Sequence, residues 1–225
     1  MNIDTILHGG RLDEIRLDRM LPRVFANEPI PESQVWRRDV TFRRPRRVLV
    51  AAESGGGKSS MCAYIYGART DYEGRLLLNG HDARELGMEQ WQALRRRHIA
   101  YLPQELSLFA ELSAWDNIQL KNRLTGHATD RQVEEWLDAL GISARRDYPA
   151  GRMSIGQQQR VAIIRAICQP FDFLLLDEPV SHLDARNNDI AAAIIAAEAD
   201  RQKAAIISTS VGNAINLDYT QTLHL

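Results

Sequence analysis

The chain has 225 residues, of which 28 are basic and 29 acidic, so its formal net charge is −1 at pH 7. This length suits one sizeable domain or at most two small ones, and a composition that is 44% hydrophobic and 25% charged is neither disordered nor fibrous. A near-neutral charge gives no reason to expect non-specific binding to nucleic acid or anionic lipid. The most apolar stretch, which begins at Ile190, is far shorter than the ~20 residues of a membrane-spanning helix.

The amino-terminal residues and the cysteines indicate the cellular compartment. Residues 1–10 carry acidic Asp4 and no basic residue before Ile6, so they do not have the pattern of a signal peptide. Cys62 and Cys168 lie far apart and do not form a disulfide framework. A reducing cytosol is therefore expected, with Cys62 as a small buried hydrophobe rather than an oxidation-sensitive thiol.

Apolar runs and turn residues predict alternating strands and helices along the chain. The expected strands cover residues 15–25, 35–42, 48–52, 75–79, 171–176 and 204–209, with another short strand near the carboxyl end. The expected helices cover residues 59–67, 130–140, 154–167 and 190–199, with Thr129 as a candidate cap of the second. Apolar strands in strand–turn–helix units predict an α/β fold with a mostly parallel sheet and a helical middle third.

A phosphate-binding loop is predicted at residues 52–60, which read Ala-Glu-Ser-Gly-Gly-Gly-Lys-Ser-Ser. This is the P-loop pattern with Ala52 in place of the first glycine. The glycines let backbone N–H groups surround phosphate oxygens, and the following helix adds its dipole. Lys58 is one of only three lysines among the 28 basic residues, and a compact ammonium suits the β- and γ-phosphates better than a forked guanidinium. The residues expected to bind the phosphates are Ser54, Gly55, Gly56, Gly57, Lys58, Ser59 and Ser60.

An acidic pair closes the strongly apolar segment at residues 173–178. Asp177 would hold Mg²⁺, together with the hydroxyl of Ser59, and Glu178 would polarise the attacking water. The alternative is a core strand that ends in a solvated acidic pair. The P-loop elsewhere in the chain favours the nucleotide site.

The most specific pattern lies at residues 153–166, which read Met-Ser-Ile-Gly-Gln-Gln-Gln-Arg-Val-Ala-Ile-Ile-Arg-Ala. Residues 153–157 look like the signature motif of the ATP-binding subunits of ABC transporters. Residues 101–104 resemble the Q-loop of that family and residues 181–184 its D-loop. The chain resembles the family over nearly its whole length.

The resemblance implies a single ABC-type ATP-binding domain over residues 1–225. Its fold would be a P-loop NTPase core with a mostly parallel sheet, an N-terminal antiparallel β subdomain and an inserted helical subdomain at about residues 105–165. The implied cofactors are ATP and Mg²⁺. The implied catalytic residues are Lys58, Gln104 and Glu178, and the implied metal ligands are Ser59, Gln104 and Asp177. Phe25 lies at about the right distance before the P-loop to be the aromatic residue that stacks on adenine, and Trp36 is the alternative. For either residue, packing in the core is an equally good interpretation.

The resemblance also implies partners. Two ATP-binding subunits would close head-to-tail around two ATP molecules, so that Ser154, Gly156 and Gln157 of one subunit face the nucleotide on the other. An integral membrane permease would form the conduit and hold this subunit on the cytoplasmic face of the membrane. The middle of the chain looks weakly like subunits of lipoprotein-release, macrolide-efflux and cell-division complexes. The transported substance would be selected by the membrane subunit.

Three positions depart from the family pattern. Besides Ala52, Ile155 replaces the first glycine of the signature pair, and a β-branched residue is poorly suited to positive φ. Where the family has a histidine that contacts the γ-phosphate, this chain has Ser210, which cannot carry charge. Two interpretations stay open: an ATPase with slow or partner-dependent hydrolysis, and a degenerate subunit that senses ATP and regulates a partner.

A cluster of arginines beside Trp36 and Phe42 superficially resembles a basic–aromatic patch that binds nucleic acid. The neutral total charge favours a solvated strand edge or hairpin instead, and no nucleic-acid partner is expected. The arginines stand at positions 37, 38, 43, 44, 46 and 47.

Overall fold

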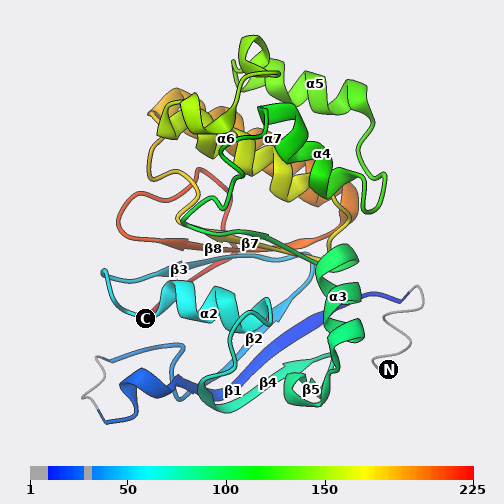
Figure 1. The fold of residues 1–225 in the computed structure, drawn as a ribbon. Coiled ribbons are helices and arrows are strands. Elements are labelled where there is room, and N and C mark those ends of the chain that lie inside the picture. The colour runs from blue at the N-terminus through cyan, green and yellow to red at the C-terminus, as the bar shows by residue number, and fades with distance from the viewer. Residues whose placement is uncertain (1–9, 28–31) are drawn as a thin grey trace.

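The computed structural model describes residues 10–27 and 32–225, so the segment judged not to be a signal peptide lies almost wholly outside the described residues. Within them, two sheets and several helices form the fold (Figure 1). The strands are β1 (Glu14–Pro22), β2 (Asp39–Arg43), β3 (Arg47–Ala51), β4 (Tyr72–Leu78), β5 (His81–Asp82), β6 (Ile99–Leu102), β7 (Phe173–Asp177), β8 (Ala205–Ser210) and β9 (Gln221–His224). The helices are α2 (Lys58–Ile65), α3 (Met88–Arg97), α4 (Ala114–Asn122), α5 (Asp130–Ala139), α6 (Ile155–Ile167) and α7 (Ala185–Gln202). Short 3-10 turns are η1 (Arg23–Phe25), η2 (Ala83–Glu85), η3 (Ser143–Arg145) and η4 (Ala150–Arg152).

The parallel sheet forms the centre of the molecule, with strand order β6-β7-β8-β3-β9. Helix α2 covers one face, and helices α4, α6 and α7 cover the other (Figure 1). Every residue of β7 is buried as a result. A strand covered on both faces needs apolar residues at successive positions, which explains the uninterrupted apolar run that predicted β7.

The second sheet is antiparallel, with strand order β2-β1-β4-β5, and lies beyond α2 (Figure 1). Asn79 and Gly80 join β4 to β5, with φ of 47° and 86°. Two-residue hairpin turns of this kind need positive φ at both positions, so the Asn-Gly turn has the expected role. This sheet is the antiparallel β subdomain expected near the amino terminus.

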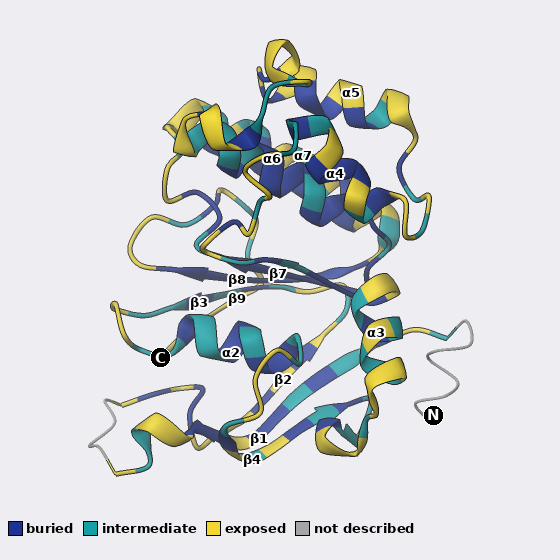
Figure 2. Ribbon diagram, viewed as in Figure 1, coloured by how far each residue is buried: buried dark blue, intermediate teal, exposed yellow. Residues whose placement is uncertain are grey.

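Helices α4 and α5 lie within residues 105–165, and α6 begins there and ends at Ile167. All three turn their buried residues toward the parallel sheet or toward one another (Figure 2). The hydroxyl of Thr129 caps α5 by accepting a hydrogen bond from the backbone N–H of Gln132 at 3.2 Å. Ser154 caps α6 in the same way. The two sheets and these helices confirm the expected fold class.

Two of the predicted strands contain a turn where part of the strand was expected. The strand expected at 15–25 ends at Pro22, and a 3-10 turn follows it. The strand expected at 35–42 begins only at Asp39. The preceding segment turns because the hydroxyl of Ser33 accepts two of its backbone N–H groups.

The helix expected at residues 190–199 is longer than predicted. It begins after Asp184, whose carboxylate accepts a hydrogen bond from the backbone N–H of Asn187 at 2.8 Å. It ends at Gln202, and the following residue, Lys203, caps it with a left-handed φ of 52°. The side-chain cap extends α7 by one turn toward the nucleotide edge of the sheet.

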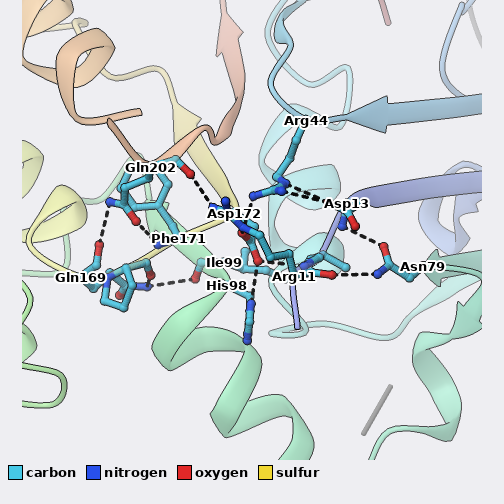
Figure 3. Close-up of polar contacts among 12 residues, drawn as sticks. Arg11, Asp13, Arg44, Asn79, His98, Ile99, Gln169, Phe171, Asp172 and Gln202 are labelled. Atoms are coloured by element: carbon cyan, nitrogen blue, oxygen red, sulfur yellow. Dashed lines mark hydrogen bonds and ion pairs between the residues drawn. The ribbon is translucent and has the colours of Figure 1, made fainter. Parts of the chain in front are cut away.

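A buried carboxylate fixes the end of the parallel sheet at which β7 begins (Figure 3). Oδ1 of Asp172 accepts hydrogen bonds from Arg11 at 2.9 Å and Arg44 at 2.7 Å. Oδ2 accepts one from the backbone N–H of Leu12 at 2.8 Å and lies 2.7 Å from Nδ1 of His98. Burial opposes ionisation of this carboxyl, but the hydrogen bonds from His98, Leu12 and Arg11 outweigh it and lower the pKa of Asp172. These contacts tie β7 to three distant segments.

Three arginines of the cluster form ion pairs with carboxylates of the same fold. Each of three guanidinium groups lies within 2.6 to 2.9 Å of an acidic side chain. Strand β2, which carries Arg43, is the edge strand of the antiparallel sheet, in agreement with one of the two expected interpretations. The other interpretation, a hairpin, was wrong, because β2 and β3 belong to different sheets. The pairs are Arg43 with Glu14, Arg44 with Asp13, and Arg47 with Asp200.

Both cysteines are buried, which confirms the expected burial of Cys62. Burial, and then the negative charge of Asp177, raise the pKa of the Cys62 thiol. Burial raises the pKa of Cys168 to about 12. In the part of the chain that the structure describes, none of the helices is both long and apolar enough to cross a membrane.

Candidate functional site

The carboxyl ends of β3, β7 and β8 meet at one edge of the parallel sheet. Ala51 at the end of β3 pairs with Ser210 of β8, and Asp177 at the end of β7 pairs with Thr209. In open α/β sheets, ligands bind at this edge. The P-loop leaves β3 here and Glu178 follows β7, so the structure brings together the two halves of the predicted nucleotide site.

Two glycines of the glycine loop have left-handed backbone conformations. Gly55 and Gly57 have φ of 85° and 90°, a region that residues with a side chain rarely adopt. A Cβ added to Gly57 would lie 3.0 Å from ring carbons of both Phe25 and Trp36. Glycine is therefore required at this position by both backbone conformation and space.

Lys58 is the first residue of α2, and its side chain is only 4% exposed. Its ammonium donates hydrogen bonds to the carbonyl oxygens of Glu53 at 2.9 Å and Ala52 at 3.3 Å. It also lies 3.7 Å from a carboxylate oxygen of Glu178. Ala52 keeps its N–H, which donates to the carbonyl of Ser210 at 3.2 Å. The ammonium thus stands between the loop and the acidic end of β7.

The oxygen atoms predicted to bind Mg²⁺ include one without a hydrogen-bond partner. The hydroxyl of Ser59 donates to Oε1 of Gln104 at 3.4 Å, which brings the Q-loop to the start of α2. Asp177 is 1% exposed; its Oδ1 accepts a hydrogen bond from Thr209, whereas its buried Oδ2 has no partner in the part of the chain that the structure describes. A buried carboxylate oxygen without a partner is costly and indicates a missing ligand.

Hydroxyl, amide and carboxylate oxygens are the donors that Mg²⁺ prefers, and Mg²⁺ commonly completes its coordination with water and substrate phosphates. No group of three His, Cys, Asp or Glu side chains suited to a metal ion occurs in residues 10–27 and 32–225. The residues therefore fit a magnesium ion that is shared with a nucleotide rather than enclosed by the protein.

Both candidate aromatic residues border the P-loop. Trp36 is 3% exposed, and its indole N–H donates to the carbonyl oxygen of Gly56 at 3.0 Å. This hydrogen bond fixes the indole ring of Trp36 against the P-loop. Phe25, at the end of η1, packs against the same core but stays half-buried.

The signature segment forms the start of α6. The hydroxyl of Ser154 accepts a hydrogen bond from the backbone N–H of Gln157, and Oε1 of Gln157 accepts one from the backbone N–H of Ser154. The expectation that Ile155 would be strained at a positive φ was wrong, because Ile155 is the first helical residue of α6. Its side chain is 48% exposed. A Cβ on Gly156 would lie 2.9 Å from the carbonyl oxygen of His182, so this glycine lets the D-loop approach.

Two residues of this edge were not singled out from the sequence. Gln159, 1% exposed on α6, accepts a hydrogen bond from the N–H of His182 at 2.9 Å and donates to the carbonyl of Glu178 at 3.4 Å. It links the signature helix to the acidic turn and the D-loop. The second residue is Thr209, which contacts both Asp177 and Glu178. The sequence contains no local signal for either contact, because both depend on elements that are distant along the chain.

Ser210 stands at the end of β8, where the family pattern has histidine. It is 2% exposed, and its buried hydroxyl has no hydrogen-bond partner in residues 10–27 and 32–225. The next residue, Val211, is 44% exposed. The chain therefore presents no charged side chain from the end of β8.

The geometry defines an ATP-binding cassette: a glycine loop, an acidic strand end and a capped signature helix on one α/β scaffold. A family model described as "ABC transporter" matches residues 37–181. The chain belongs to the ABC transporter family.

Several named relatives are ATP-binding proteins of transport systems. The chain is 35% identical, over 76% of its own length and 76% of the relative's, to the lipoprotein-releasing system ATP-binding protein LolD of Granulibacter bethesdensis. It is 38% identical to the molybdate/tungstate import ATP-binding protein WtpC of Thermococcus kodakarensis, over 66% of this chain and 45% of WtpC. It is 34% identical to the macrolide export ATP-binding/permease protein MacB 1 of Aeromonas hydrophila, over 66% of this chain and 24% of MacB 1.

Solved structures share the fold at lower identity. The dimeric structure of the ABC transporter cassette MJ0796 superposes with a TM-score of 0.71 at 22% identity, over 87% of both chains. The ATP-bound structure of a bacterial Atm1-family ABC exporter gives a TM-score of 0.75 at 22% identity, over 95% of this chain and 37% of the exporter. This similarity confirms the fold of an ABC cassette.

Proposed function

We propose that the chain is the ATP-binding and ATP-hydrolysing subunit of a membrane transporter, driven by ATP-dependent closure of a dimer. The observation that carries this proposal is the meeting of Lys58, Asp177 and Glu178 at one sheet edge, in a member of the ABC transporter family. ATP must bind the closed dimer more tightly than the open one for such closure to occur.

The proposed nucleotide site consists of the P-loop and the residues beside it. Residues 54–60 bind the phosphates, and Phe25 stacks on adenine because it retains exposed surface beside the loop. The oxygens of Ser59, Gln104 and Asp177 would hold Mg²⁺, and Oδ2 of Asp177 has no hydrogen-bond partner among the described residues. When bound, the ion would neutralise charge on the transferred phosphoryl group.

The proposed catalytic group is Glu178, which polarises the attacking water, while Lys58 binds the phosphoryl oxygens. The side chain of Glu178 is 18% exposed, so solvent reaches it. Hydrolysis is slow or depends on a partner, since the buried Ser210 supplies no charge at the γ-phosphate.

The second candidate function is nucleotide sensing without turnover, which the uncharged Ser210 and the exposed Ile155 favour. The intact pair of Asp177 and Glu178 opposes it, because a subunit that only binds ATP has no need of a residue that polarises water. A single-turnover measurement of ATP hydrolysis separates the two functions.

The proposed partners are a second ATP-binding subunit and an integral membrane permease. In the dimer, Ser154, Gly156 and Gln157 face the nucleotide of the other subunit, where the amino end of α6 favours an anion. This arrangement would place the chain on the cytoplasmic face of the membrane. LolD and WtpC, which are similar over at least 66% of this chain, are named as ATP-binding proteins of a releasing and an import system.

A groove of about 350 Å³ beside the Q-loop suits the permease. Burial lowers the pKa of both Lys121 and Arg165 in this groove, and neither forms an ion pair with a carboxylate of the described residues. The exposed side chains of Phe109 and Leu120 form its apolar rim. The groove therefore receives a permease segment that carries a carboxylate between apolar side chains. The groove lining includes Tyr66, Tyr101, Pro103, Phe109, Leu120, Lys121 and Arg165.

The test of the proposed function is nucleotide binding and turnover by the purified chain. Binding of a fluorescent ATP analogue in Mg²⁺ is expected, followed by slow release of phosphate that accelerates with the copurified membrane partner. If the chain binds no ATP, either alone or with the membrane partner, both the transporter function and the sensing alternative are contradicted.

A further inference from the structure

One hydroxyl contacts both acidic residues of the candidate site. Thr209 is fully buried on β8, and the parallel register places it opposite Asp177 on β7. Its Oγ1 donates a hydrogen bond to Oδ1 of Asp177 at 2.6 Å. A hydroxyl-to-carboxylate bond of this length is charge-assisted and stronger than a neutral one.

The same hydroxyl supports the backbone of the next residue. Oγ1 of Thr209 accepts a hydrogen bond from the N–H of Glu178 at 3.2 Å. Glu178 has a left-handed φ of 50°, which is unfavourable for a residue with a side chain. A strained backbone persists only where its surroundings hold it, and such positions concentrate at functional sites.

The two contacts together decide which oxygen of Asp177 is free. A hydroxyl has one proton and two lone pairs, so Thr209 can donate to Asp177 and accept from Glu178 at the same time. Its proton is donated to Oδ1, and Oδ2 is the oxygen that remains buried with no partner among the residues that the structure describes. The direction of the free oxygen is thereby fixed by β8 rather than by the strand that carries Asp177.

We propose that Thr209 is a positioning residue for the ATP site: it orients Asp177 toward Mg²⁺ and holds Glu178 in its strained turn. This inference rests on the proposed function, since it assigns Asp177 to the metal. Partners of metal ligands commonly change metal affinity by about 10- to 100-fold when they are removed. Neighbouring Ser208 lies on the other face of β8, where side chains alternate, and has no such role.

The test compares Thr209→Val, Thr209→Ser and Thr209→Ala with Ser208→Ala as the matched buried-hydroxyl control. Affinity for a fluorescent ATP analogue is measured in Mg²⁺ and in EDTA, with circular dichroism to confirm folding. The valine and alanine variants are expected to lose about tenfold or more of the Mg²⁺-dependent affinity and to keep binding in EDTA. The serine variant and Ser208→Ala should match the wild type.

Three results would overturn the proposal. The first is an unchanged Mg²⁺ dependence of ATP affinity in Thr209→Val or Thr209→Ala. The others are a loss of Mg²⁺-dependent affinity in Thr209→Ser, or in Ser208→Ala, that equals the loss in Thr209→Val. If the valine variant does not fold, the alanine variant is compared with the serine variant instead, because alanine adds no volume at this buried position. Wild-type protein that binds no ATP would contradict the proposed function itself, whereas wild-type binding with no effect of Thr209 contradicts only this inference.

Discussion

The ammonium of Lys58 lies 3.7 Å from a carboxylate oxygen of Glu178, across the edge where the P-loop and β7 meet. Lys58 is 4% exposed and Glu178 18%, so water screens this pair less than a surface pair. The same ammonium donates to two P-loop carbonyls. A γ-phosphate bound in the loop would therefore compete with Glu178 for Lys58 and leave the carboxylate free to polarise water.

Replacement of Lys58 by alanine should abolish tight ATP binding. Charged hydrogen bonds contribute about 1.5–3 kcal/mol each, so the affinity should fall by at least about tenfold. Lys58→Arg should also weaken binding, because a planar guanidinium does not fit the enclosed position of the ammonium. Lys203→Ala, at the end of α7, is the matched control. Calorimetric titration with Mg-ATP would measure the change, and an undiminished affinity in Lys58→Ala would contradict the assigned role.

Ser210→His should accelerate ATP hydrolysis. A side chain that donates to the developing charge on the γ-phosphate contributes about tenfold or more in rate. Ser210→Ala should hydrolyse at the wild-type rate, because the serine hydroxyl has no partner to lose. Phosphate release by the three proteins at saturating ATP would test this. No acceleration in Ser210→His, or fast partner-independent turnover by the wild type, would show that the missing histidine does not limit hydrolysis. A large loss of rate in Ser210→Ala would contradict the absence of a role for the serine hydroxyl.

Charge reversal at Lys121 should weaken the docking of the membrane partner. Lys121 lines the groove beside the Q-loop, where an acidic segment is expected, so Lys121→Glu would place like charges together. Lys203→Glu makes the same charge change at the carboxyl end of α7. Copurification of the membrane partner should decrease for Lys121→Glu and stay unchanged for Lys203→Glu. Equal copurification with both variants would exclude this groove as the docking surface.

Asp172 should make the stability of the fold sensitive to acid. Its pKa is lowered in the fold, so its stabilising contribution is complete above the unfolded value of about 4 and is lost as the pH falls through the folded value. Asp172→Asn leaves Arg11 and Arg44 without their buried carboxylate and should cost about 3 kcal/mol at pH 7.

Thermal unfolding of the wild type and Asp172→Asn between pH 3 and pH 7 would test this prediction. The difference between them should shrink toward the acidic end. Asp147→Asn, which removes an exposed carboxylate, is the control and should change little. A constant difference between wild type and Asp172→Asn across the range would contradict the assignment.

Local sequence patterns predicted the parts of the fold that depend on local physics. The apolar run before Asp177 predicted a strand that is covered on both faces, and Thr129 predicted the start of a helix. Both predictions succeeded because strand burial and helix capping depend on a few neighbouring residues. The Ser33 turn was missed, since a side chain that bonds nearby backbone groups competes with an apparent strand pattern.

Contacts between distant segments could not be predicted in the same way. The bond between Thr209 and Asp177 depends on the register of two parallel strands, and the Asp172 cluster joins residues up to 161 positions apart. The error at Ile155 arose because the family pattern gave the residue type but not its backbone conformation, which the structure shows to be helical. Assembly of the P-loop with the acidic strand end was predictable, since parallel strands share one carboxyl edge.

The most direct test of the central claim is ATP-dependent dimerisation of Glu178→Gln. The substitution keeps the shape of the side chain but removes the charge that polarises water, so ATP should bind and persist. Size-exclusion chromatography with light scattering should show a dimer in Mg-ATP and a monomer without nucleotide, and Lys58→Ala in the same background should abolish the dimer. ATP-driven closure would be contradicted if Glu178→Gln binds ATP yet stays monomeric at all concentrations, both alone and with the membrane partner.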